Sequence, residues 1–162
     1  MYHSYMKEIA IVLPDIRSVL NVGSVFRTAD ATAVSKIYLC GYTAAPIDRF
    51  GRKRNDLHKA ALGAENDVPW EQNQNTQETL QKLKSKGYFI VAVEQDERSV
   101  LYNSFDYSPY DKIALVFGNE VHGVSGEIKK TVDAIVELPM HGKKESLNVS
   151  VAAGVMMYYL RD

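Results

Sequence analysis

Residues 113–126 read IALVFGNEVHGVSG, and residues 134–150 read AIVELPMHGKKESLNVS. In both segments a short apolar run stops at a loop rich in Gly, Asn, His and Ser. Such runs are typical of buried parallel strands that are bounded by turn residues. Ligands of open α/β sheets bind where the strands end and the loops begin. We therefore expect these two loops to form one ligand site.

The rest of the chain alternates strand-like and helix-like segments. We expect strands over residues 8–13, 36–40, 88–93, 113–117 and 134–138, with a short edge strand over 66–70. We expect helices over residues 18–33, 57–63, 75–86, 126–132 and 147–160, with an irregular crossover over 98–112. This alternation predicts an α/β fold with a mainly parallel sheet and helices on both faces. No repeat or linker interrupts the 162 residues, so we expect a single domain over 1–162.

The helix that follows the first strand has a clear apolar face. Apolar residues from Val22 to Ala29 follow the i, i+3, i+4, i+7 spacing of a buried face. Asn21 precedes this face and is a good N-cap residue, and Gly23 would let another backbone approach the first turn. Arg27 lies off the apolar face, as either a solvated helix arginine or a functional residue.

The composition is that of an ordinary globular protein, with 46% hydrophobic and 24% charged residues, so disorder is not expected. The one cysteine, Cys40, cannot form an internal disulfide, which fits a reducing, cytoplasmic location. The chain starts without a signal-peptide pattern, and no apolar stretch is long enough to span a bilayer, so we expect no membrane association. A net charge of −1 argues against strong nonspecific binding of nucleic acid.

The loop over residues 41–56 contains the dense basic cluster of the chain. Its cations are Arg49, Arg52, Lys53 and Arg54. A charge run of this kind is commonly a solvated loop. Tyr42 and Phe50 accompany the cations, however, and stacking combined with phosphate contact is how single-stranded RNA is held. An RNA-binding loop is therefore the alternative.

Several common chemistries do not fit the loops. The segment GNEVHGVSG lacks both the GxGxxG spacing and the lysine of a P-loop. The four histidines have no metal-ligand spacing, so we expect no metal site. The run from Gly123 to Gly126 misses the frame of a hydrolase nucleophile elbow. Glu120 is then either a loop cap that accepts backbone N–H groups or a carboxylate with a catalytic or substrate-binding role, and Ser146 and Asn148 are candidate N-caps of the last helix.

Three segments together resemble the motifs of the SpoU-type RNA 2′-O-ribose methyltransferases, within the SPOUT class. They are NVGSVFRTAD at 21–30, LVFGNEVHGVS at 115–125 and LPMHGKKESLNVSVA at 138–152. Their order and spacing match over nearly the whole chain. The resemblance implies a C-terminal trefoil knot, a homodimer, S-adenosylmethionine held in the knotted loops, and tRNA or rRNA as substrate. The short length is similar to that of the minimal tRNA wobble-position enzymes, while rRNA stays open.

The resemblance also implies roles for individual residues. The positions that match catalytic residues of the motifs are Asn21, Arg27, Glu120, Ser146 and Asn148. Those expected around the cofactor are Val93, Glu94, Gly118, Asn119, Leu138, Met140, Ser146 and Leu147, with the role of Glu94 and its neighbour Gln95 left open. An arginine is nearly always protonated, so Arg27 suits stabilisation of an alkoxide or a phosphate better than a base role.

Two other functions stay open. A catalytically inactive RNA-binding relative would keep the fold, although the four intact polar motif positions argue against it. A methyltransferase for a base or a protein is the second, and related families that modify bases lack the asparagine–arginine first motif.

The last helix is apolar on almost every side, so we expect it to be buried. Its small residues, Ala152 to Gly154, would let another helix approach within one subunit or across a dimer.

Overall fold

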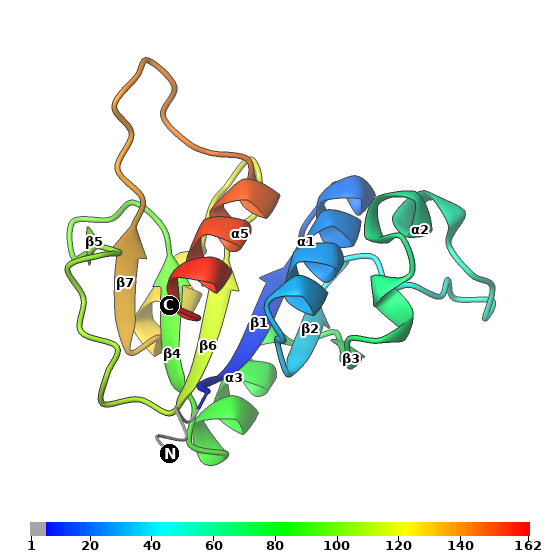
Figure 1. The fold of residues 1–162 in the computed structure, drawn as a ribbon, viewed down its shortest axis with the longest axis horizontal. Helices are drawn as coiled ribbons and strands as arrows, with labels where there is room; N and C mark the ends of the chain where they lie inside the picture. The colour runs from blue at the N-terminus through cyan, green and yellow to red at the C-terminus, as the bar shows by residue number, and fades with distance from the viewer. Residues whose placement is uncertain (1–5) are drawn as a thin grey trace.

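The computed structural model describes residues 6–162, which fold around a seven-stranded sheet (Figure 1). The strands lie in the order β3-β2-β1-β6-β4-β7-β5, and each neighbouring pair is parallel. Their bounds are β1 (Glu8–Pro14), β2 (Lys36–Cys40), β3 (Trp70–Asn73), β4 (Phe89–Val93), β5 (Val100–Leu101), β6 (Lys112–Phe117) and β7 (Ala134–Glu137). The predicted parallel sheet is confirmed.

Helices cover both faces of this sheet, as predicted (Figure 1). Their bounds are α1 (Val19–Ala31), α2 (Asn55–Ala61), α3 (Thr76–Ser85), α4 (Gly126–Thr131) and α5 (Val149–Tyr159), with a short 3₁₀ helix η1 (Ala64–Asn66). On one face α1, α2 and α5 share a core with Ile9, Ile11 and Leu13 of β1. On the other face α3 and α4 share a core with Ala10 and Val12. Because successive strand side chains point to opposite faces and both faces are covered, β1 is apolar from Ile9 onward.

The start of α1 differs from the prediction. Ser18, not Asn21, is the N-cap residue, and its hydroxyl accepts the backbone N–H of Asn21 at 3.2 Å. The cap lies three residues earlier than predicted because serine and asparagine are both good caps and the sequence offers both. The amide of Asn21 therefore lies inside the first turn, where its side chain is available for other contacts.

Two further segments differ from the prediction. The edge strand does not occupy residues 66–70: it is β3, which pairs with β2 from Trp70 to Asn73. The crossover expected to be irregular contains β5, which pairs with β7. Neither strand has the apolar run on which the prediction relied. β3 is mostly polar, and the two residues of β5 are exposed.

The last helix is shorter and less buried than predicted. It starts at Val149, with Asn148 as the N-cap residue that accepts the backbone N–H of Ser150 at 2.8 Å. Its inner face is buried, whereas Val151 and Tyr158 are 50% and 54% exposed. The prediction of all-round burial is therefore wrong for the single chain. An apolar sequence does not show by itself which side of a helix has a neighbour.

One sheet runs through the described residues, which supports a single domain; that boundary and the trefoil knot stay predictions. Within residues 6–162 none of the helices combines the length and the apolar character needed to cross a membrane. In the same residues no group of three or more His, Cys, Asp or Glu side chains is placed to hold a metal ion.

At Gly23, α1 and α2 come very close together. A β-carbon at this position would lie 2.6 Å from the carbonyl oxygen of Leu57 and 2.7 Å from the β-carbon of Ala60. One of these atoms belongs to the backbone of α2, so the clash cannot be relieved by turning a side chain. The close approach predicted for Gly23 is confirmed.

We expect Gly23→Ala to lower the free energy of unfolding by about 1–2 kcal/mol. Overpacking of this kind costs about 1–3 kcal/mol, and alanine regains up to about 1 kcal/mol over glycine in a helix. Denaturant unfolding followed by circular dichroism measures the change. Gly126→Ala, in α4, is the matched control because a β-carbon there would have no neighbour within 4 Å. Equal stability of the two variants would contradict the close helix contact.

Candidate functional site

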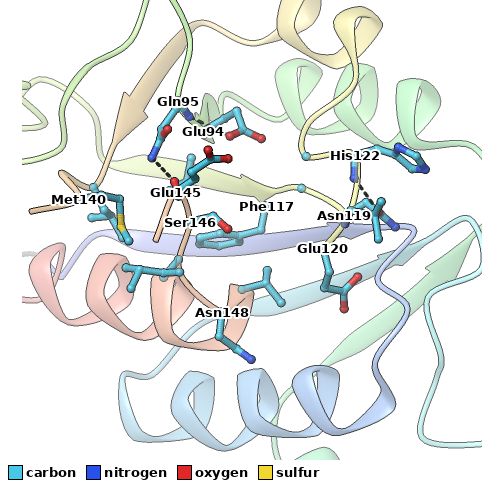
Figure 2. A pocket seen from close by; sticks show the side chains of 18 of the residues that line it. Glu94, Gln95, Phe117, Asn119, Glu120, His122, Met140, Glu145, Ser146 and Asn148 are labelled. Atoms are coloured by element: carbon cyan, nitrogen blue, oxygen red, sulfur yellow. Dashed lines mark hydrogen bonds between the residues drawn. The ribbon is translucent and has the colours of Figure 1, made fainter. Parts of the chain in front are cut away.

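A cavity of about 600 Å³ opens at the carboxyl ends of β4, β6 and β7 (Figure 2). Its volume falls in the range of about 300–1,000 Å³ that is usual for small-molecule sites. All eight residues predicted to surround a cofactor line it: Val93, Glu94, Gly118, Asn119, Leu138, Met140, Ser146 and Leu147. The structure therefore brings together segments that lie up to 54 positions apart in the sequence. Their roles toward a ligand stay predictions.

The loop after β6, residues 118–125, forms one wall of the cavity and is held tightly. Asn119 and Gly123 exchange two backbone hydrogen bonds, of 3.1 and 2.8 Å. A β-carbon on Gly118 would lie 2.3 Å from the carbonyl carbon of Gly123 and 2.5 Å from the nitrogen of Val124. Only glycine fits at position 118, because the loop folds back directly over it.

Glu94 and Gln95, whose role the sequence left open, fasten the two loops of the cavity. One carboxylate oxygen of Glu94 accepts the backbone N–H of Val124 at 2.9 Å, which fixes the loop after β6. The side-chain amide of Gln95 donates to the carbonyl oxygen of Glu145 at 2.7 Å, which fixes the loop after β7 (Figure 2). Both residues follow β4, so the middle strand positions both walls.

Asn119 lines the cavity, but its side chain is fully used within the protein. Its amide nitrogen donates to the carbonyl oxygen of Asp15 at 2.7 Å and contacts the hydroxyl of Tyr42 at 2.8 Å. Its amide oxygen accepts the backbone N–H groups of Val121 and His122, at 2.8 and 3.0 Å. A primary amide offers two donors and one acceptor oxygen with two lone pairs, so no capacity is left for a ligand. The backbone N–H of Asn119 is also taken, by the carbonyl oxygen of Gly123, so only the second lone pair of its own carbonyl oxygen is left to accept a hydrogen bond.

Glu120 has the capping role that was one of its two interpretations. Its two carboxylate oxygens accept the backbone N–H groups of Arg17 and Ser18, each at 3.0 Å, at the start of α1. Partial burial would raise the pKa of Glu120, but these hydrogen bonds outweigh it and lower the pKa below the ordinary value. The carboxylate is therefore ionised at neutral pH, and a catalytic role for it stays a prediction.

A line of hydrogen bonds joins Glu120, Asn21 and Asn148. The amide nitrogen of Asn21 lies 3.4 Å from a carboxylate oxygen of Glu120, and the amide nitrogen of Asn148 donates to the amide oxygen of Asn21 at 3.1 Å. Asn148 also caps α5. Ser146 lines the cavity beside it. Three of the five residues predicted to be catalytic therefore line the cavity, and Asn21, which does not line it, contacts two of them.

Arg27 and the basic loop do not join this group. Arg27 is exposed on α1, six residues and about 9 Å of helix beyond Asn21, and does not line the cavity. None of the four cations between Arg49 and Arg54 lines it either. The site residues predicted from the sequence did not include Lys129, which lies in α4 and lines the cavity. No pattern in the sequence marks that lysine, because its place depends on how α4 packs.

Comparison with known proteins identifies a family for this chain. Residues 8–158 match the model that describes the SpoU rRNA Methylase family. The chain belongs to this family.

Two relatives and one solved structure show how closely other proteins resemble this chain, and over how much of each chain. A putative TrmH family tRNA/rRNA methyltransferase, YacO of Bacillus subtilis (strain 168), is 33% identical over 91% of this chain and 56% of its own length. The tRNA (guanosine(18)-2′-O)-methyltransferase of Aquifex aeolicus (strain VF5) is 33% identical over 94% of this chain and 68% of its own. An AdoMet-bound rRNA methyltransferase from Sinorhizobium meliloti superposes with a TM-score of 0.85, at 28% identity over 95% of this chain and 56% of the other. The chain thus spans little more than half of the first of these relatives.

We expect Glu120→Gln to change how stability depends on pH. The lowered pKa means that the ionised Glu120 stabilises the fold above its ordinary pKa, and that this contribution is lost as the pH falls through the folded-state value. At neutral pH the variant should therefore be less stable than the native protein, and the difference should shrink in acid. Thermal unfolding measured from pH 7 down to about pH 3 tests this.

Glu97→Gln provides the control, because Glu97 is exposed and makes no hydrogen bond through its side chain in the described part of the chain. Its stability should follow that of the native protein at each pH. A difference between the native protein and Glu120→Gln that stays constant with pH would show that the charge of Glu120 has no part in holding α1.

Proposed function

We propose that the protein transfers a methyl group from S-adenosylmethionine to a ribose 2′-hydroxyl of tRNA or rRNA. The observation that carries this proposal is the line of hydrogen bonds through Glu120, Asn21 and Asn148, which gathers residues of all three family motifs beside one cavity. The names of the Aquifex relative and of the Sinorhizobium structure support the reaction and the cofactor. We place this activity in the cytoplasm as part of the same proposal.

The residues around the cavity fit S-adenosylmethionine. Apolar side chains of Val93, Leu138, Leu147 and Ala152 offer a surface for an adenine ring. In the described part of the chain, the backbone N–H groups of residues 140–147 make no hydrogen bond, so they are available to a ligand. When bound, the cofactor supplies an electrophilic methyl group on a sulfonium, which needs no metal.

The protein's own groups would position the acceptor ribose. Glu120 is a poor base, because it is ionised with a lowered pKa and both of its oxygens already accept hydrogen bonds. Its role in the proposal is to orient Asn21. Asn21, Ser146 and Asn148 would then hold the ribose by hydrogen bonds, so that its hydroxyl meets the methyl group in line. A cation is still needed to stabilise the developing alkoxide, and Arg27 is the candidate.

Arg27 does not line the cavity of its own chain, and a homodimer would place it beside the cavity of the partner. Arg27 follows Leu20 by two helical turns, so both lie on the outward face of α1. Leu20 is 58% exposed, and next to α1 the outward face of α5 presents Val151, Val155 and Tyr158. This surface, which we call the α1/α5 face, is apolar and unpartnered in one chain. We propose that a second copy covers it and contributes its Arg27.

We expect the purified protein, given S-adenosylmethionine and cellular RNA, to form a 2′-O-methylated nucleoside that mass spectrometry of the digested RNA identifies. An RNA with a single 2′-deoxy nucleotide at the mapped position should still bind, because its phosphates and bases remain, yet accept no methyl group. Methyl transfer to that nucleotide would place the methyl group on the base and overturn the ribose assignment.

Arg27→Ala supplies the matched inactive variant for this assay. It should abolish transfer while calorimetry still shows cofactor binding, because Arg27 does not line the cavity. Native protein that binds RNA but neither binds S-adenosylmethionine nor transfers a methyl group would favour the inactive RNA-binding alternative.

We expect Val155→Arg to convert the dimer into monomers. The substitution would place an unpaired charge in the apolar contact proposed for the α1/α5 face, which is costly. Sedimentation velocity measures the change. Val100→Arg is the control, because Val100 on β5 is 44% exposed against 38% for Val155 and lies outside that face. A native protein that sediments as an active monomer would contradict the dimer.

A further inference from the structure

Residues 47–53 form a small, well-held hairpin at the edge of the molecule beyond α2 (Figure 1). Ile47 and Lys53 pair as an antiparallel bridge at its base. The carboxylate of Asp48 accepts the backbone N–H groups of Phe50 and Arg52, at 2.8 and 2.9 Å. The backbone N–H of Asp48 in turn donates to the carbonyl oxygen of Arg52 at 2.8 Å. The tip of the hairpin is therefore fixed by its own hydrogen bonds.

Phe50 stands at this tip with 66% of its surface exposed, more than any other large apolar side chain in the described part of the chain. The guanidinium carbons of Arg49 and Arg52 lie 4.8 and 4.9 Å from the centroid of its ring. These are cation–π distances. Because the hairpin holds the backbone, Phe50 cannot turn inward to join the core.

The structure divides the basic cluster of this loop into paired and unpaired cations. Arg52 forms an ion pair with Asp48 at 3.0 Å, and Arg54 forms one with Asp56 at 2.8 Å. Within residues 6–162, Arg49 and Lys53 have no acidic partner. The four cations that the sequence suggested for RNA binding are thus unequal, and the two unpaired ones flank Phe50 closely in sequence.

We propose that Phe50 forms a stacking site for an unpaired base of the RNA, and that Arg49 and Lys53 contact the adjoining phosphates. The identity of that RNA as a methylation substrate rests on the function proposed above. Base stacking on an aromatic ring, strengthened by arginine and combined with phosphate contact, is a common way to hold single-stranded nucleic acid.

An unpaired base fits this surface better than a duplex does. In a duplex the faces of the bases are covered by their neighbours, and proteins reach mainly the phosphates and the 2′-hydroxyls. An exposed ring at the tip of a hairpin can act only on a base whose face is open. The unpaired charges of Arg49 and Lys53 also favour an anionic partner over an apolar protein surface.

The two arginines have different roles in this site. Arg52 contacts both the ring and Asp48, so moving it would break two contacts. Arg49 has the ring of Phe50 as its contact in the described chain, so it can move aside at little cost. An arriving base would therefore take the position of Arg49 over the ring, and the displaced guanidinium would turn toward the backbone of the RNA.

The test measures the affinity of the protein for a stem–loop RNA and for a blunt duplex of equal length, by fluorescence anisotropy over a range of salt concentrations. Phe50→Ala should weaken stem–loop binding about tenfold with an unchanged salt dependence, since base stacking is lost and phosphate contacts remain. Phe50→Trp should restore the affinity. Arg49→Gln and Lys53→Gln should each reduce the slope of log K against log salt by about 0.7.

Duplex binding should be unchanged in Phe50→Ala, and so should cofactor binding, because Phe50 lies outside the cavity. Equal loss of stem–loop and duplex binding in Phe50→Ala would overturn the stacking site. No loss of either would also overturn it, and would indicate that the exposed ring contacts a protein partner instead. The readout is RNA affinity, so it is separate from methyl transfer. If the protein methylates RNA but Phe50→Ala leaves its RNA affinity unchanged, only the stacking site is contradicted. If Phe50→Ala weakens stem–loop binding but the native protein transfers no methyl group, only the methyltransferase proposal is contradicted.

Discussion

Glu120 extends from the loop after β6 and accepts two backbone N–H groups at the start of α1, so one carboxylate joins segments about 100 residues apart. The first N–H groups of a helix have no partner within the helix, and the positive end of the helix favours a negative charge. The same carboxylate contacts Asn21, which accepts from Asn148 at the start of α5. This contact joins the loop to α1 and, through Asn21, to the start of α5 at the polar end of the cavity, while the shared apolar core packs the two helices together.

The cavity walls are preorganised by one close backbone approach and by two hydrogen bonds from side chains to the backbone of the loops. Gly118 lets the loop after β6 fold back on itself, Glu94 binds that loop from β4, and Gln95 holds the loop after β7. A site whose loops are already ordered loses less conformational entropy when a ligand binds. This lower cost favours the binding of a small molecule in the cavity.

The electrostatics of the chain are local. A net charge of −1 offers no general attraction for RNA, and two of the four clustered cations are neutralised by neighbouring aspartates. The proposed RNA contacts therefore rely on a few placed groups, namely Phe50 with Arg49 and Lys53 on the hairpin and Arg27 on α1. A dimer would present two copies of each, which would strengthen binding if one RNA reached both.

The sequence by itself determined the α/β class, the five main strands, the apolar face of α1 and the two strand-end loops, because each leaves a local pattern of apolar and turn residues. It failed at β3 and β5, which have no apolar run, and at Asn21, where Ser18 was an equally good cap. Only the tertiary structure decided that Asn21 meets Glu120 and Asn148, and that Arg27 lies apart from them. Those outcomes depend on how distant segments pack, and no local pattern of residues encodes the distance between two side chains that far apart in the chain.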